Sequence, residues 1–269
     1  MYPFKYVRAT DLVAAEELLS GDEECIVLAG GMTLLPTMKQ RLAQPSRLLD
    51  LSALEELHGI TVTSSAVTIR AMTVHADVAE SSDILSRLPA LAGLAAEIGD
   101  PQIRNRGTIG GSVANADPAA DYPAALLALD ATVVTSHRSL SADQFFIDMF
   151  ETALEGNEIV QSISFKIPLK ATYVKFPNPA SRYAVAGVFV AEFDGEYRVA
   201  VTGVAGAVFR YTAVEEALQN DPTIESIQQA LSEHPLDEDE LNDDIHASAA
   251  YRAHLTGVLA QRAFLNLSG

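Results

Sequence analysis

The 269-residue chain contains one cysteine and no tryptophan. The single cysteine, Cys25, excludes an internal disulfide and a cysteine-ligated iron–sulfur cluster held by this chain alone. Because Cys25 stands between acidic residues and a short apolar run, we expect a half-buried structural thiol rather than a nucleophile. This cysteine usage accords with a reducing compartment, and we expect a cytoplasmic protein.

Basic residues are scarce in this sequence. The 18 lysines and arginines face 36 aspartates and glutamates, which gives a formal net charge of −18. So few scattered cations cannot form the basic face that binds nucleic acid, and they give no attraction to an anionic membrane surface. Residues 1–5 lack an apolar signal core, and no apolar stretch is long enough to span a bilayer. We therefore expect no nucleic-acid partner and no membrane span.

The common patterns of catalytic and metal-binding residues are also missing. The six histidines show no metal-ligand spacing, and there is no G-x-S-x-G motif of a serine hydrolase. His75 lies in an expected helix with Asp77, and we expect it to be a surface or core histidine. The sequence therefore predicts no catalytic residue and no metal site, which is typical of a protein whose cofactor does the chemistry.

Two glycine-rich motifs are the most informative feature that the sequence does contain. Each places a glycine pair beside a small hydroxyl residue, and neither matches G-x-G-x-x-G or a P-loop. Backbone without a Cβ atom can approach a ligand closely and present its N–H groups to a pyrophosphate. Tight turns also use Gly-Gly pairs, so each motif alone has a structural alternative. The candidate binding residues of the two motifs are Ala29, Gly30, Gly31, Met32, Thr33 and Leu34, and Thr108, Ile109, Gly110, Gly111 and Ser112.

A group of polar residues follows the second motif. Asn115, Asp117 and Asp121 stand in a mostly apolar neighbourhood, where they suit the polar edge of a ligand ring. Their alternative role is turn formation, which Asn and Asp favour. The hydroxyls of Thr33 and Ser112 can donate hydrogen bonds to phosphate oxygens. Together the two motifs indicate one dinucleotide held from two sides.

The apolar periodicity predicts an α+β fold. Near residue 170 we place a boundary between a first domain, 1–170, with subdomains of about 1–55 and 56–170, and a second domain, 171–269, with a small sheet covered by helices. Helices are expected over 10–19, 34–42, 73–81, 88–99, 122–129 and 251–267. Strands are expected over 25–29, 48–51, 60–63, 66–70, 131–135 and 159–165, and three antiparallel strands over 185–193, 197–204 and 207–211.

The two motifs resemble those of a known family. Segment 29–36 is similar to the first flavin loop of the FAD-binding medium subunits of molybdenum hydroxylases, such as the carbon monoxide dehydrogenase medium subunit and the flavin domain of xanthine dehydrogenase. Segment 100–112 is similar to their second loop and its approach, and 113–121 continues the match. The resemblance implies a FAD cofactor. It also implies a two-part FAD-binding domain of the vanillyl-alcohol-oxidase (PCMH) type, followed by a C-terminal domain with a three-stranded antiparallel sheet and helices.

The resemblance also implies roles for individual residues. The motif residues 29–33 and 108–112 would hold the FAD pyrophosphate, and Asn115, Asp117 and Asp121 would lie near the ribityl chain or the isoalloxazine ring. Segment 175–184 is similar to a segment near the flavin ring, where Tyr183 would cover one face and Lys175 would lie close to the ring edge. Ordinary packing at the start of a strand is the alternative for Tyr183.

Two positions depart from the family pattern. Met32 stands where histidine is frequent in the carbon monoxide enzymes, which weakens that substrate assignment. Ser112 stands where asparagine is common, and it keeps a hydrogen-bonding group on a shorter side chain. We expect FAD binding to survive both departures.

The function that the resemblance implies is an electron relay. The chain would be the flavoprotein subunit of a heteromeric molybdenum hydroxylase, with a molybdenum-cofactor large subunit and a [2Fe-2S] small subunit in a dimer of heterotrimers. FAD would pass electrons to an external acceptor such as NAD⁺, oxygen or a quinone. Two alternatives stay open: a stand-alone FAD-dependent oxidoreductase acting on a small organic substrate, and a flavin-free scaffold or assembly protein.

Overall fold

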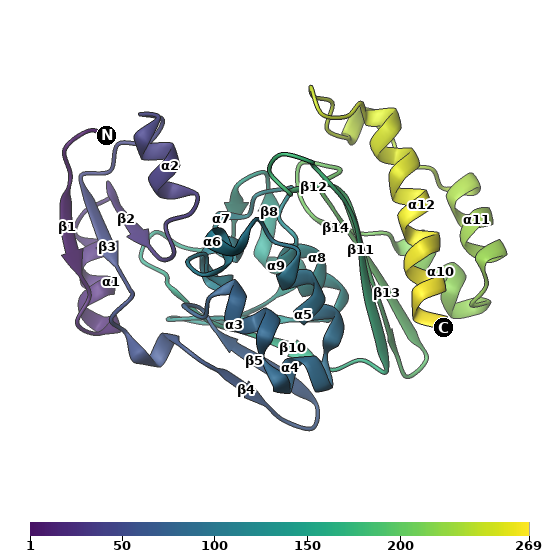
Figure 1. Cartoon of the computed structure of the whole chain (residues 1–269), viewed down its shortest axis with the longest axis horizontal. Coiled ribbons are helices and arrows are strands. Elements are labelled where there is room, and N and C mark those ends of the chain that lie inside the picture. The colour runs from purple at the N-terminus through teal and green to yellow at the C-terminus, as the bar shows by residue number, and fades with distance from the viewer. Residues whose placement is uncertain (269) are drawn as a thin grey trace.

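The computed structural model describes residues 1–268 (Figure 1). Gly269, the last residue of the expected domain 171–269, lies outside the described residues. Three sheets follow one another along the long axis of the molecule, from the N-terminal sheet on the left of Figure 1 to the C-terminal sheet on the right. No helix within residues 1–268 is both long and apolar enough to cross a membrane.

The N-terminal part is a three-stranded parallel sheet of order β1-β3-β2 with two helices. Its elements are β1 (Lys5–Arg8), α1 (Leu12–Ser20), β2 (Cys25–Leu28), α2 (Leu34–Lys39), β3 (Arg47–Asp50) and a 3₁₀ turn, η1 (Glu55–Leu57). Asp11 begins α1, because its carboxylate accepts a hydrogen bond from the amide of Ala14 at 2.8 Å. Helix α2 ends before the predicted position 42, since Arg41 takes a φ of 64°, outside the helical region.

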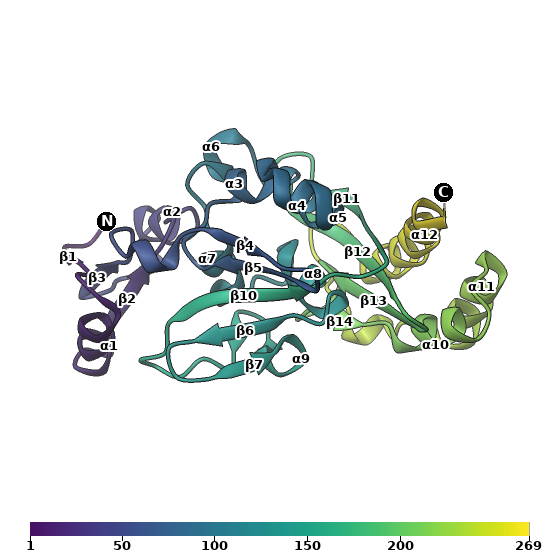
Figure 2. The same ribbon diagram turned by 90° about the horizontal axis from the view of Figure 1, so that it is seen from below.

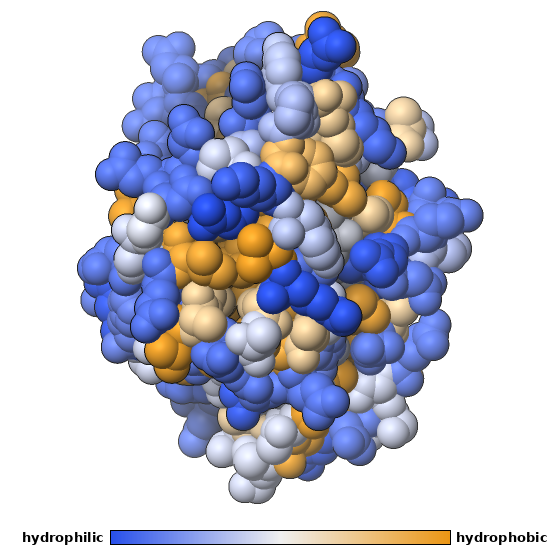
Figure 3. All heavy atoms as spheres, turned by 90° about the vertical axis from the view of Figure 1, so that its left-hand side faces the viewer, coloured by the Kyte–Doolittle hydropathy of each residue, from blue (hydrophilic) through white to orange (hydrophobic). Residues whose placement is uncertain are grey.

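The N-terminal sheet leaves part of one face exposed. Strand residues alternate between faces, so Val7 and Val27 pack against the core while Tyr6 and Ile26 are 56% and 37% exposed. Seen from this end of the molecule, apolar side chains are visible among the hydrophilic ones (Figure 3). Cys25 is a free thiol that is 8% exposed, and burial raises its pKa. It is therefore the structural thiol that the sequence predicts, more deeply buried than expected.

The central part is a five-stranded antiparallel sheet of order β4-β5-β10-β6-β7 with seven helices among the described residues (Figure 2). Its strands are β4 (Ile60–Val62), β5 (Ala66–Arg70), β6 (Thr132–Thr135), β7 (Ser139–Ser141) and β10 (Val160–Lys166), and a separate hairpin consists of β8 (Phe146–Asp148) and β9 (Glu151–Thr152). Its helices are α3 (His75–Glu80), α4 (Ser82–Arg87), α5 (Pro89–Ala96), α6 (Pro101–Arg104), α7 (Ile109–Asn115), α8 (Tyr122–Ala128) and α9 (Ala142–Phe145).

The C-terminal part is an antiparallel sheet of order β11-β12-β13-β14. The three predicted strands are present, and β11 is a fourth strand that the sequence pattern did not reveal, because lysines and a proline interrupt its apolar residues. Helices α10 and α12 cover the sheet on the right of Figure 1, and α11 packs against these two helices. The elements are β11 (Lys170–Pro177), β12 (Ala184–Phe193), β13 (Glu196–Thr202), β14 (Phe209–Arg210), α10 (Thr212–Asn220), α11 (Ile224–Glu233), η2 (Glu238–Glu240) and α12 (Ala249–Ser268).

Helix α8 joins the central core to the C-terminal sheet. All seven of its residues are buried, and it packs against β12 and β13. One hydrophobic cluster runs from Ile69 of β5 through Leu126 of α8 to Phe189 of β12. A helix that is apolar on all sides must be covered on all sides, so α8 fixes the C-terminal sheet against the centre.

Candidate functional site

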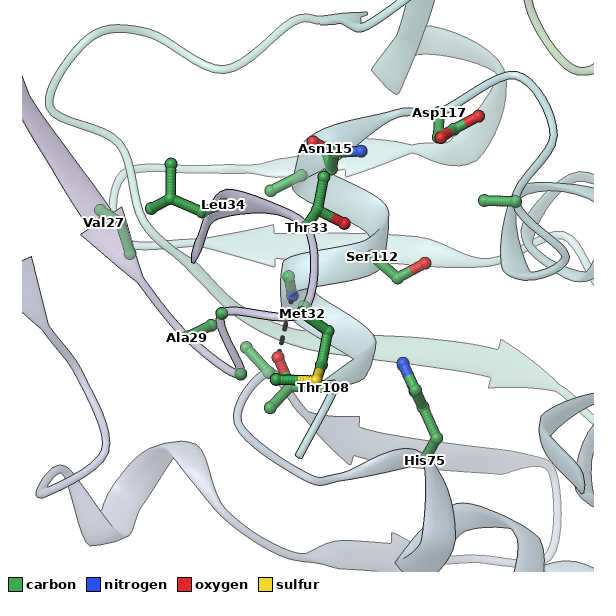
Figure 4. A pocket seen from close by; sticks show the side chains of 18 of the residues that line it. Val27, Ala29, Met32, Thr33, Leu34, His75, Thr108, Ser112, Asn115 and Asp117 are labelled. Carbon is green, nitrogen blue, oxygen red and sulfur yellow. Dashed lines mark hydrogen bonds between the residues drawn. The ribbon is translucent and has the colours of Figure 1, made fainter. Parts of the chain in front are cut away.

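A cavity of about 560 Å³ lies where the three parts of the chain meet. The residues that the sequence identified come to it from distant segments, and Figure 4 shows the N-terminal motif facing Ser112, Asn115 and Asp117 across it. Fourteen of the sixteen predicted residues line the cavity: Ala29, Gly30, Gly31, Met32, Thr33, Leu34, Thr108, Gly110, Gly111, Ser112, Asn115, Asp117, Asp121 and Tyr183.

The first motif is a turn between β2 and α2 that leaves its amides free. Gly31 has a φ of +73°, a conformation that favours glycine. Leu35 begins the hydrogen-bonded turns of α2 by donating to the carbonyl of Gly31 at 3.0 Å. Within residues 1–268, the backbone N–H groups from Gly31 to Leu34 donate to no protein acceptor. These N–H groups are therefore available to the oxygens of a bound anion.

The second motif is built differently, because its amides from Ile109 to Ser112 are already paired within the protein. Thr108 is the N-cap of α7, and its side-chain oxygen accepts from Gly111 N at 3.2 Å, the dashed line in Figure 4. The amide of Ile109 donates to Thr73 O at 3.1 Å and that of Gly110 to Ala71 O at 2.8 Å. The expectation that both motifs present free N–H groups is thus wrong for residues 109–112, which supply side chains and a closely packed wall, while the N–H of Thr108 donates to no acceptor within the described residues.

Ile109 does not line the cavity. Its side chain is fully buried in the central hydrophobic core, where it anchors the first turn of α7. The helical period explains this result, because only one face of a helix can point toward a ligand beside it, and the side chain of Ile109 points the other way. The neighbouring Ser112 has its hydroxyl on the cavity side (Figure 4).

The polar residues beyond α7 reach the cavity because the helix stops abruptly. Ala116 takes a left-handed conformation with a φ of 45° and ends α7, which turns the chain so that Asn115 and Asp117 both line the cavity. Burial raises the pKa of Asp117, and the amide of Ala119, which donates to its carboxylate at 2.9 Å, opposes that rise. The sequence left open whether these polar residues form a turn or line a ligand site, and in the structure both roles apply together.

Asp121 lies on the wall of the cavity and belongs to a buried polar cluster. Its carboxylate accepts a hydrogen bond from Tyr173 Oη at 2.5 Å and one from Lys175 Nζ at 3.1 Å. Burial raises the pKa of Asp121, while the Lys175 ammonium and the Tyr173 hydroxyl act to lower it. This carboxylate is therefore already occupied by protein donors.

Lys175 does not line the cavity, which corrects the expected place at the flavin ring edge. Its side chain is 1% exposed, and its ammonium group is directed at Asp121 and at two backbone carbonyls. A buried ammonium needs acceptors for its three N–H groups, and the protein interior supplies all of them.

Tyr183 lines the cavity from the loop between β11 and β12. The residue is 41% exposed, and the side chain of Thr33 in the first motif lies near its hydroxyl and acts to lower its pKa. Partial burial raises the pKa of Tyr183, and the nearby carboxylate of Asp117 adds to the rise. An aromatic ring at this place can cover a ligand ring, as the sequence predicts.

His75 is a cavity residue that the sequence did not assign to the site. It is 4% exposed, its Nδ1 atom has no hydrogen-bond partner within the described residues, and Figure 4 shows its side chain reaching toward the cavity. Burial and the charge of Arg104 lower its pKa to about 4, so the imidazole is neutral near pH 7. A lone histidine on a helix carries no sequence signal of this role. The sequence also contained no sign of Ile98 and Gly99 at the cavity, and it placed Ile103, Gly107, Ser181 and Arg182 in segments near the flavin without assigning them a role.

Comparison with known families decides the identity of this fold. Residues 2–169 match the model of the FAD binding domain in molybdopterin dehydrogenase, and residues 171–267 match that of the CO dehydrogenase flavoprotein C-terminal domain. The chain belongs to this family. It is a medium, FAD-binding subunit of the molybdenum hydroxylase type, and FAD is its cofactor.

Relatives of this flavoprotein subunit cover its whole length. It is 34% identical to the glyceraldehyde dehydrogenase medium chain of Sulfolobus acidocaldarius, over 98% of this chain and 99% of the relative. It is 33% identical to the nicotine 6-hydroxylase medium subunit of Paenarthrobacter nicotinovorans, over 96% and 95%. The structure of carbon monoxide dehydrogenase from Hydrogenophaga pseudoflava that lacks the Mo-pyranopterin moiety matches with a TM-score of 0.90, at 36% identity over 99% of this chain and 98% of that chain.

The cavity of the flavoprotein subunit fits FAD chemically. Its volume lies within the range of small-molecule sites, and its apolar walls carry a few polar groups. The free amides from Gly31 to Leu34 suit the anionic part of a dinucleotide, and Tyr183 suits its aromatic part. His75 adds a neutral imidazole to the same wall.

Proposed function

We propose that this chain relays electrons within a heteromeric molybdenum hydroxylase. Electrons would leave the substrate at a molybdenum cofactor on a large subunit, cross [2Fe-2S] clusters on a small subunit, and reach FAD here. The support is that the relatives are named as medium chains or subunits of dehydrogenases and hydroxylases, and that one cysteine cannot hold an iron–sulfur cluster on this chain. We further propose a dimer of heterotrimers.

The observation that carries the proposal is the meeting of three distant segments at one cavity. We assign the N–H groups from Gly31 to Leu34 and the hydroxyls of Thr33 and Ser112 to the pyrophosphate. Asn115 and Asp117 are assigned to the ribityl chain or the ring, and Tyr183 to one face of the ring. When bound, FAD supplies a ring that accepts electrons and passes them on.

The substrate belongs to a partner subunit in this proposal. The relatives are named for glyceraldehyde, nicotine and carbon monoxide, which are chemically unrelated, although their medium chains share this fold and length. A cavity that serves FAD alone accounts for this range. We assign residues 1–170 to the FAD-binding domain, with parts 1–55 and 56–170, and 171–269 to the C-terminal domain.

The proposal is tested by reconstitution with the partner that holds the iron–sulfur clusters. That subunit is reduced with dithionite, freed of excess reductant, and mixed without oxygen with the FAD-loaded chain. We expect bleaching of the flavin absorbance, followed by its recovery when NAD⁺, oxygen or a quinone is added in separate samples. The acceptor that restores the absorbance fastest is the candidate physiological one.

The stand-alone oxidoreductase predicts a different result. In that case the purified, FAD-loaded chain would oxidise a small organic substrate by itself, and no molybdenum or iron subunit would copurify. Metal analysis and mass spectrometry of the complex isolated through a tag on this chain distinguish the two functions.

A further inference from the structure

The ammonium group of Lys175 connects three segments that form the cavity. It contacts the carboxylate of Asp121 at the start of α8, with N–O distances of 3.0 and 3.1 Å. It donates to the carbonyl of Glu97 at 3.1 Å and to that of Arg182 at 3.0 Å. Asp121 and Arg182 line the cavity themselves, and the residue after Glu97, Ile98, also lines it.

The loop that carries Tyr183 is built around Asn178, whose side-chain oxygen accepts from Ala180 N at 2.9 Å and from Ser181 N at 3.2 Å. Asn178 closes it from one end, because its amide donates to Tyr183 O at 2.8 Å and its carbonyl accepts from Arg182 N at 2.9 Å. Arg182 has a φ of 63°, a strained conformation for a residue with a side chain. The hydrogen bond from Lys175 to Arg182 O acts on the peptide unit that joins Arg182 to Tyr183.

We propose that Lys175 is a positioning residue that holds Tyr183 against the FAD cavity by fixing the Arg182 carbonyl. The proposal rests on the proposed FAD site, and it adds a buried residue that supports the wall of that site from inside the protein. Lys175 has no contact with the cavity and acts through the backbone, while its charge is balanced by Asp121. Tyr173, next but one in β11, supports the same carboxylate from Oη at 2.5 Å.

The absence of tryptophan gives a direct way to observe the position of Tyr183. In the Tyr183→Trp variant the only indole of the chain replaces a side chain that is 41% exposed. The emission maximum of this indole and its quenching by acrylamide report the position of the loop without any FAD. We expect Lys175→Met to raise the quenching constant about twofold and to shift the emission to the red, because a released loop residue becomes solvent-exposed.

A charge-neutral double variant in the same background separates positioning from stability. Lys175→Met alone leaves the Asp121 carboxylate buried without its cation, which destabilises the fold. Adding Asp121→Asn removes that charge, so we expect the thermal midpoint to return toward that of the parent while the quenching of the indole stays high. Lys166→Met is the matched control. Lys166 also pairs with an aspartate, Asp130, but its side chain is 63% exposed, so this substitution should leave the quenching unchanged.

Two results would overturn the proposal. One is an indole environment that does not change when Lys175→Met is introduced. The other is a double variant that restores the parent quenching or fails to fold, because either would assign Lys175 to charge balance and stability. The failure of the FAD site is recognised separately: the parent chain would then bind no FAD in fluorescence titration, whatever the quenching experiment gives.

Discussion

The four glycines of the two motifs differ in what surrounds their missing side chains. A Cβ atom on Gly30 would lie 2.1 Å from the carbonyl oxygen of Arg106, and one on Gly110 would lie 2.7 Å from that of Ala71. These two positions are closed by the protein's own backbone. Gly111 has more room, with Thr108 Oγ1 at 3.0 Å and Ala29 Cβ at 3.4 Å from the added atom. Gly30 and Gly110 therefore serve packing.

We expect Gly30→Ala and Gly110→Ala to destabilise the fold itself. Forcing a methyl group against backbone lowers the free energy of unfolding by about 3 kcal/mol. Urea denaturation of the FAD-free protein measures the change. Gly93→Ala is the control, because that glycine is exposed in α5 and its added Cβ meets nothing within 4 Å. Equal stability of all three variants and the parent would contradict this explanation.

Gly111→Val should act on the cofactor. The larger side chain would extend between Thr108 and Ala29, where the two motifs approach each other beside the cavity. We expect FAD affinity to fall at least about tenfold, equivalent to about 1.4 kcal/mol. The ratio of flavin to protein absorbance after gel filtration measures it. Normal flavin content in this variant would show that the second motif does not border the cofactor.

His75 should make stability depend on pH. Its folded pKa of about 4 lies below the usual value of 6.5, so the unfolded state binds the proton more tightly. Stability from the neutral imidazole is full above about pH 6.5 and falls as the pH is lowered toward 4, by up to about 3 kcal/mol. Denaturation at pH 7, 5.5 and 4.5 measures this. His75→Gln should show a shallower fall, and parallel curves would disprove the assignment.

At the scale of elements, periodic segments were predictable and buried polar segments were not. The apolar run of α8 and the alternation of β12 and β13 follow from burial, so the sequence located them. Strand β11 escaped notice because Lys170 and Lys175 stand in it, and only the tertiary structure shows that Lys175 has buried acceptors. The approach of residues 29–34 to 108–112 was inferred from the likeness of the two motifs and from the family resemblance, since no local pattern encodes it.

The turn between β6 and β7 offers a prediction at this scale. Arg138 donates from Nε to Glu158 at 2.9 Å, and this hydrogen bond, helped by one from Thr135, outweighs burial and lowers the pKa of Glu158 to about 2. The stabilisation is present above about pH 4.5 and is lost as the pH falls toward 2. The side chain of Arg138 is 39% exposed, so solvent screens its charge. We therefore expect Arg138→Met to lower the free energy of unfolding at pH 7 by only about 1–2 kcal/mol.

Urea denaturation checks the Arg138 prediction. The difference between parent and Arg138→Met should shrink when both are measured at pH 3. A difference that is the same at both pH values would show that packing of the arginine, rather than its charge, stabilises the turn.

At the scale of the whole molecule, the cofactor cavity lies between separately built sheets. A ligand that contacts all three parts binds only the folded chain, so it stabilises by mass action. At FAD concentrations about 100 times the dissociation constant, we expect about 2.7 kcal/mol of added stability and a higher thermal midpoint. Gly111→Val should show a much smaller shift at the same FAD concentration. An identical shift in both proteins would indicate FAD binding elsewhere.

The meeting of Thr33 and Tyr183 at one cavity has a consequence for biosynthesis. Thr33 leaves the ribosome early, while Tyr183 follows only after the whole central part of the chain has been made. Contacts between such distant positions form late, because the intervening loop must first be closed. The N-terminal part of the nascent chain therefore has the free N–H groups of the first motif before the residues that enclose the cavity have been made. Cofactor loading is expected to be a post-translational step.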